Sequence, residues 1–94
     1  MGTSRRFQRN EEIVYMEEED GAFLFNPDSG NLKYMNQSGR AAYLALDGQN
    51  DVNRLVGHLL ELFSGVKRAQ IEKDVEGFLK ELEENGFISS SDKG

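Results

Sequence analysis

Apolar residues alternate with polar ones over the first third of the chain and then recur about every 3.6 residues. Residues 13–18, 22–25 and 31–35 are rich in β-branched, aromatic and other apolar residues, and turn residues separate them. Asp20-Gly21 favours a type I′ hairpin turn, and the segment 26–30 combines Pro27 with a glycine suited to a left-handed turn position. The pattern predicts a three-stranded antiparallel meander whose outer strands have open edges.

The helical period begins at Asn36. Asn36 and Asp51 are suited to cap the first and second helices, which we expect to end at Asp47-Gly48 and Ser64-Gly65. A third helix is predicted from Arg68 to Asn85, and Phe87 and Ile88 are expected to fold back onto the core. The sequence therefore predicts an α+β domain in which a three-stranded antiparallel β-meander is followed by three helices. The second and third helices resemble a helix-turn-helix with the sheet as its wing.

The two ends of the chain lack an apolar period. Residues 1–10 are basic and polar, and residues 89–94 form a serine-rich polar tail. We expect both segments to be disordered and residues 11–88 to form the folded domain. A chain of 94 residues is long enough for one domain with a small core.

Composition narrows the possible functions. The chain has no cysteine, and its formal net charge of −6 opposes binding to nucleic acid, whose affinity depends on neutralising phosphates. No apolar run approaches the length of a membrane-spanning helix, and we expect a cytoplasmic protein that does not contact membranes. His58 is the only histidine, and no catalytic triad or phosphate-binding loop can be assembled. These features predict a non-enzyme without a cofactor.

The spacing of several short motifs resembles the PqqD-like family, whose members are also called RiPP recognition elements. The motifs are Phe25-Asn26-Pro27-Asp28-Ser29-Gly30, Tyr34-Met35-Asn36-Gln37-Ser38, Leu46-Asp47-Gly48, Phe63 with Val66, Asp74-Val75, Phe78-Leu79, Leu82, and Asn85-Gly86-Phe87-Ile88. Each motif alone is unspecific, but together they extend over nearly the whole expected domain. Three positions differ from the family pattern. Met35 replaces a leucine, Asp51 replaces a threonine, and Lys67 stands where a better helix cap is usual.

The resemblance implies a winged-helix-like domain that binds the leader segment of a ribosomally made precursor peptide. It also implies delivery of that peptide to a modifying enzyme, commonly a radical SAM enzyme. The leader would add beside the third strand and rest against the third helix, a binding mode that an open strand edge allows. A winged-helix DNA-binding regulator is the alternative, but six acidic residues outnumber three basic ones between Arg68 and Asn85. A domain that self-associates through the same edge is a third possibility, and we expect a monomer or weak homodimer.

The candidate peptide-binding residues come from the third strand and third helix. They are Asn31, Leu32, Lys33, Tyr34, Met35, Lys67, Arg68, Ile71, Asp74, Val75 and Phe78. Lys33 is suited equally to meeting an acidic peptide and to protecting an exposed edge from aggregation. Apolar helix residues such as Val75 are more often core than cleft, although their edges can line a groove. Lys67 and Arg68 are either an anchor for carboxylates or an unoptimised helix start.

Overall fold

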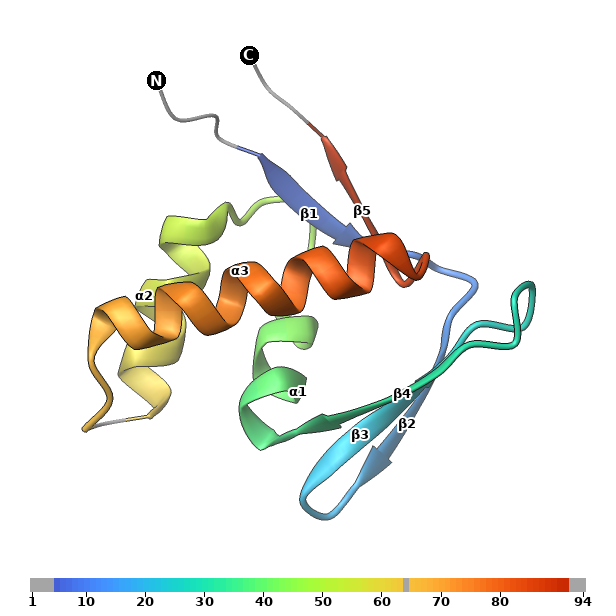
Figure 1. Cartoon of the computed structure of the whole chain (residues 1–94), viewed down its shortest axis with the longest axis horizontal. Helices are drawn as coiled ribbons and strands as arrows, with labels where there is room; N and C mark the ends of the chain where they lie inside the picture. The colour runs from blue at the N-terminus through green and yellow to red at the C-terminus, as the bar shows by residue number, and fades with distance from the viewer. Residues whose placement is uncertain (1–4, 64, 92–94) are drawn as a thin grey trace.

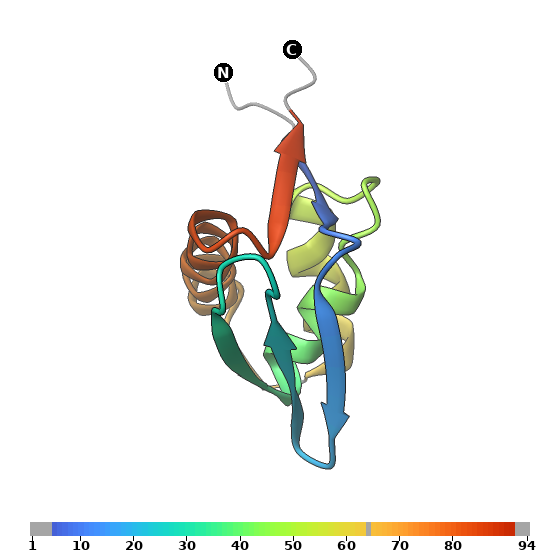
Figure 2. The same ribbon diagram turned by 90° about the vertical axis from the view of Figure 1, so that its right-hand side faces the viewer.

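The computed structural model describes residues 5–63 and 65–91, which form two small sheets and three helices. In chain order the elements are β1 (Arg6–Arg9), β2 (Val14–Glu18), β3 (Gly21–Phe25), β4 (Leu32–Asn36), α1 (Gln37–Leu44), α2 (Val52–Leu62), α3 (Arg68–Glu84) and β5 (Ile88–Ser91). The strands β2, β3 and β4 lie side by side and antiparallel, in that order (Figures 1 and 2). The predicted α+β class and the meander followed by three helices are confirmed.

The turn between β2 and β3 differs from the predicted type I′ turn. Glu18 pairs with Gly21, so Glu19 and Asp20 form the turn, and neither has the positive φ that a type I′ turn requires. Gly21 belongs to the ladder instead, where a Cβ atom would overlap the backbone carbonyl of Met35 on β4. This glycine is therefore needed for the close approach of two strands and not for the turn.

The second turn of the meander is as expected. Gly30 has φ 80° and donates its N–H to the carbonyl of Asn26 at 2.7 Å. The Asn26 side chain accepts a hydrogen bond from the N–H of Asp28 at 3.0 Å, which fixes the turn around Pro27. This turn sets where β4 begins.

The helix caps agree with the sequence in most respects. The side chains of Asn36 and Asp51 each accept a first-turn backbone N–H at 2.9 Å, whereas Lys67 provides no side-chain cap. The N–H groups of Gly86 and Phe87 donate to the carbonyls of Glu83 and Leu82, the Schellman arrangement that ends α3. Helix α1 is shorter than predicted, because it ends at Leu44 and leaves Leu46 and Gly48 in the following loop. Ser64, expected at the end of α2, lies outside the described residues.

The prediction of disordered ends was wrong for residues on both sides of the domain. Strands β1 and β5 pair antiparallel from Arg6↔Ser91 to Arg9↔Ile88 and lie side by side in Figure 1. Phe7 is buried in the core, where it anchors the pair. This pairing joins segments about 80 residues apart, so no local periodicity could indicate it. Residues 1–4 and 92–94 lie outside the described part of the chain.

The core lies between the inner face of the meander and the helices. The sheet contributes Ala22, Leu24 and Met35, and the helices contribute the apolar faces of α1, α2 and α3. Phe87 and Ile88 fold back onto this core as expected, with 1% and 4% of their surfaces exposed. Among the described residues, no helix is long and apolar enough to cross a membrane.

Candidate functional site

Strand β4 has one paired edge and one open edge among the described strands. In an antiparallel ladder, hydrogen-bonded and non-hydrogen-bonded pairs alternate. The N–H of Asn26 donates to the carbonyl of Asn31 at 2.9 Å, and the β3–β4 register continues from that pair without a break. By this alternation Lys33 and Met35 bond to β3, whereas Leu32 and Tyr34 direct their N–H and C=O groups to the open edge. The strand therefore presents unpaired backbone groups at two alternate residues.

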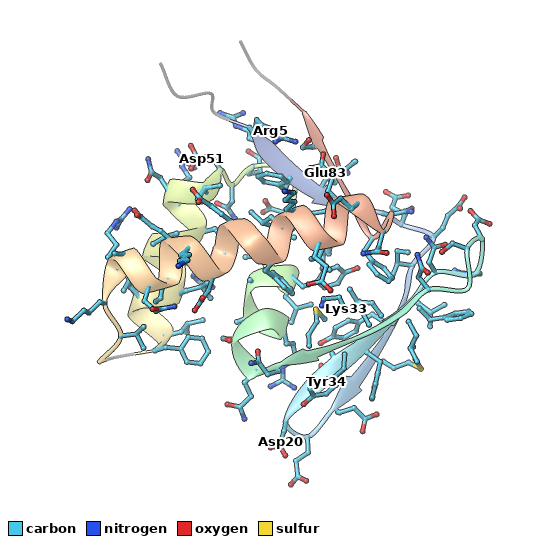
Figure 3. All side chains as sticks on the ribbon, in the orientation of Figure 1. Arg5, Asp20, Lys33, Tyr34, Asp51 and Glu83 are labelled. Atoms are coloured by element: carbon cyan, nitrogen blue, oxygen red, sulfur yellow. The ribbon has the colours of Figure 1, made fainter. Side chains whose placement is uncertain are left out.

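The side chains of β4 also alternate. Met35 is buried in the core, and Lys33 shares its face, with 18% of its side chain exposed. Leu32 and Tyr34 point to the opposite, outer face and are 61% and 49% exposed. In Figure 3, Lys33 lies between β4 and α3, while Tyr34 lies on the other side of the strand. The inner face of β4 thus meets the helices, and its outer face meets solvent.

Lys33 connects β4 to α3. Its ammonium lies 2.9 Å from a carboxylate oxygen of Glu81 and 5.9 Å from the centroid of the Phe78 ring. Asn31, just before the strand, places its amide nitrogen 3.4 Å from the side-chain oxygen of Asn85, at the end of the same helix. These contacts hold the second half of α3 beside the strand. They also show that Lys33 is already paired, so it is not the free edge cation that either interpretation of the sequence assumed.

A small hollow of about 80 Å³ lies where the first turn of α1 faces α3. It is lined by Ser38, Gly39, Ala42, Leu59, Ile71, Asp74, Val75 and Phe78. Gly39 leaves room at the edge of the hollow, because a Cβ atom there would lie 3.3 Å from Met35 Cβ and 3.4 Å from the Phe78 ring. Asp74 accepts a hydrogen bond from Gln70 at 3.0 Å and is the one acidic residue of the lining. The hollow is thus mainly apolar and carries one carboxylate.

The structure brings most of the candidate residues together, but not all of them. Ile71, Asp74, Val75 and Phe78 line the hollow, although Ile71 and Val75 are only 7% and 4% exposed and act mainly as core. Lys67 and Arg68 do not line it. Arg68 instead pairs with Glu72 at 3.0 Å and donates to Asn53 on α2.

Sequence reasoning missed the contributions of α1 and α2 to this site. Ser38, Gly39, Ala42 and Leu59 line the hollow but were not among the candidates. The available signal was Gly39, a poor helix former placed three residues after the Asn36 cap. Glu81 could be placed on the polar flank of α3 from the sequence, but its pairing with Lys33 could not, because the two residues are distant in sequence.

Strand β2 forms the other edge of the meander, but it is less suited to adding a strand. Glu17 and Glu18 occupy two of its five positions, and charged side chains discourage edge pairing. On its inner face, Tyr15 stacks on Tyr43 with ring centroids 5.9 Å apart, which closes that side. Burial raises the pKa of Tyr43 above its ordinary value, which reflects how closely this side of the sheet is packed. The β4 edge is therefore the better place for a partner strand.

Together the fold and the site define a winged-helix-like domain with an open strand edge, an adjoining helix and a small apolar hollow. The family model described as "Coenzyme PQQ synthesis protein D (PqqD)" matches residues 21–88. The chain belongs to this family, and the resemblance inferred from its motifs is confirmed. None of the curated proteins matches the sequence significantly.

Two solved structures share the fold. One is described as "TbiB1 in Complex with the TbiA(beta) Leader Peptide", with a TM-score of 0.75 and 18% identity over 87% of this chain and 94% of that chain. The other is "Lasso peptide synthetase B1 complexed with the leader peptide", with a TM-score of 0.75 and 21% identity over 89% of this chain and 98% of that one. The similarity covers almost all of each domain, including the meander and the helices.

Proposed function

We propose that this protein binds the leader segment of a ribosomally synthesised precursor peptide by adding it as a strand beside β4. The observation that carries the proposal is the open β4 edge, where the backbone groups of Leu32 and Tyr34 are unpaired, on a strand that runs directly into α1 and so leads to the hollow between α1 and α3. Membership of the PqqD family supports it, and both similar solved structures are complexes with a leader peptide.

In this proposal the backbone supplies affinity and the side chains supply selection. Alternate residues of the bound peptide point toward α3, where one of them enters the hollow against Val75 and Phe78. The bound peptide would lie in a groove between β4 and α3, with the hollow at one end. The pair between Lys33 and Glu81 bounds this groove at the other end, and the Glu81 side chain is 56% exposed. Because Lys33 is largely buried, with 18% of its side chain exposed, its ammonium needs a partner, and a peptide carboxylate can take the place of the more exposed Glu81 without leaving that charge unpaired.

The candidate residues at the start of α3 fit the proposal in a different way. Lys67 and Arg68 lie at the opposite end of the helix from Glu81. They would contact only a peptide long enough to run along the whole helix. Reversing both charges should weaken the binding of a long leader peptide and leave the binding of a short one unchanged.

We further propose that the protein has no catalytic role and acts by delivering the peptide to a modifying enzyme, such as a radical SAM enzyme or a lasso peptide synthetase. Binding one segment of a precursor raises the effective concentration of the rest at a nearby active site. Ordering a disordered leader costs several kcal/mol, so we expect micromolar affinity.

The test is a titration of isotope-labelled protein with the leader of the precursor encoded beside its gene, followed by a scan of N-methylated peptides. An N-methyl group removes one backbone donor without changing the side chain. Affinity should fall at every second position of the bound segment and be unchanged at the positions between. Chemical shift changes should be confined to β4, α1 and α3 and to the surroundings of Leu59 on α2, which also lines the hollow.

Two results would contradict the proposal. Loss of affinity without a two-residue period would show that the peptide does not bind as a strand. Shift changes with duplex DNA and none with the leader would support the DNA-binding alternative.

A further inference from the structure

The outer face of the meander is apolar in two continuous rows. The register aligns Val14 with Phe25 and Leu32 in one row, and Met16 with Phe23 and Tyr34 in the other. Val14 and Met16 are 43% and 42% exposed, while Leu32 and Tyr34 are more exposed still. The Phe23 and Tyr34 rings contact each other, with centroids 5.1 Å apart. Apolar surface thus crosses the whole sheet on the side that the helices leave uncovered.

Both rows end at the open edge of β4. Leu32 and Tyr34 have sheet neighbours on the β3 side only, and their own backbone groups point to the edge where a further strand would pair. Side chains directly opposite each other on neighbouring strands have Cβ atoms about 4.5–5.5 Å apart. A strand added to β4 would therefore place one residue against Leu32 and another, two positions away, against Tyr34.

We infer that Leu32 and Tyr34, the ends of the two rows on the outer face of β4, recognise a second face of the bound peptide, so the leader carries apolar residues at two positions, i and i+2, that point away from α3. The inference rests on the proposed function and extends it. One face of the peptide fits the hollow between α1 and α3, and the other continues the two apolar rows. The recognised segment is therefore apolar on both faces, unlike an ordinary surface strand.

Charge distinguishes the peptide from a second copy of the chain as the occupant of this face. The hairpin at the end of the sheet carries Glu17, Glu18, Glu19 and Asp20, and the whole chain has a net charge of −6. Two copies packed face to face would bring these acidic hairpins to the border of one interface. A peptide on β4 lies at the opposite edge of the sheet from β2 and covers the most exposed ends of the rows.

The test compares two double variants on the same face. Leu32→Ser with Tyr34→Ser removes the side chains next to the peptide and leaves the β4 backbone in place. Val14→Ser with Met16→Ser makes the same kind of change on β2, two strands away. The first pair should weaken binding of the leader peptide about tenfold, which corresponds to about 1.4 kcal/mol, and the second should leave it unchanged. Circular dichroism would check that both variants fold.

Serine substitutions along the peptide identify the contacts. At two positions separated by one residue, serine should weaken binding to the wild-type protein but not to the Leu32→Ser, Tyr34→Ser variant. At the position that enters the hollow, serine should weaken binding to both proteins equally.

Each remaining outcome counts against the inference. Wild-type affinity in the Leu32→Ser, Tyr34→Ser variant would overturn it while leaving strand addition intact. An equal loss in both double variants would show that the effect does not depend on the peptide edge. Self-association that both double variants abolish would assign the face to a second copy. Failure of the wild-type protein to bind the leader at all would overturn the proposed function as well.

Discussion

Replacing Gly39 by alanine should separate peptide binding from stability. Gly39 lies in the first turn of α1, and the added Cβ would sit 3.3 Å from Met35 Cβ and 3.4 Å from the Phe78 ring, at the edge of the hollow. Gly77, in the middle of α3, offers a matched control, because its added Cβ would have nothing within 4 Å. The two variants make the same chemical change, but only Gly39→Ala reduces the space of the hollow.

The two variants should differ in both stability and peptide binding. Alanine is favoured over glycine by about 1 kcal/mol in a helix interior, so Gly77→Ala should raise the free energy of unfolding by about that amount. At Gly39 the same gain is offset by the tight contacts with Met35 and Phe78, and we expect a net change close to zero. A peptide side chain that fully enters the hollow contributes about 1.5–3 kcal/mol. Excluding it should weaken leader binding roughly ten- to a hundredfold.

Two measurements check this. The chain has no tryptophan, so unfolding in urea is followed by far-ultraviolet circular dichroism, and binding by the anisotropy of a fluorescent leader peptide. Gly77→Ala should bind the leader like the wild type. If Gly39→Ala also binds like the wild type while remaining folded, no peptide side chain occupies the hollow, and the reasoning is refuted.

Three further predictions concern the fold that supports the site. Phe7→Ala should lower the free energy of unfolding by about 3–5 kcal/mol in a denaturant titration, because Phe7 is 4% exposed. The same substitution at Phe25, which is only half-buried, should lower it clearly less. Gly21→Ala should destabilise the protein by about 1–3 kcal/mol, since the new Cβ would overlap the Met35 carbonyl, and an unchanged urea midpoint would contradict the close packing of β3 and β4. Glu83→Gln should destabilise the protein at pH 7, because the Ser90 hydroxyl and the Arg5 guanidinium lower the pKa of Glu83 although burial opposes them. The loss should be less than about 1 kcal/mol, because the pair with Arg5 is partly exposed to solvent. A lowered pKa stabilises the fold only while the carboxyl is ionised, so the stabilities of variant and wild type should converge as the pH falls below about 4.

Local patterns were sufficient for the elements whose stabilising contacts are close in sequence. The meander, the three helices and the caps at Asn36 and Asp51 all depend on residues within a few positions of each other. The type I′ turn was the exception, because Gly21 is required by its neighbour on β4 and not by the turn itself. A glycine next to an aspartate has the same appearance in the sequence in either case.

Contacts between distant segments could not be predicted in this way. Strand β1 contains one apolar residue, Phe7, between charged and polar neighbours, and β5 contains mostly serine. Neither segment alone has the alternating apolar pattern that predicts a strand, and each forms a strand by pairing with the other. The pair between Lys33 and Glu81 has the same origin, since it joins residues from β4 and α3 that only the fold brings together.

The arrangement of these distant contacts explains how the groove can be ready for a peptide before one binds. Helix α3 is held on the core by its buried residues Ile71, Val75, Leu79 and Leu82. Polar contacts add to this at its start, between Arg68 and Asn53, and at its end, between Asn31 and Asn85. Between its two ends, α3 contacts β4 through the Lys33 side chain, which reaches Glu81 and Phe78. Because the helix is held at both ends, the strand edge and the hollow keep their relative positions without a peptide between them. Preformed geometry lowers the ordering cost of binding, so most of that cost falls on the leader.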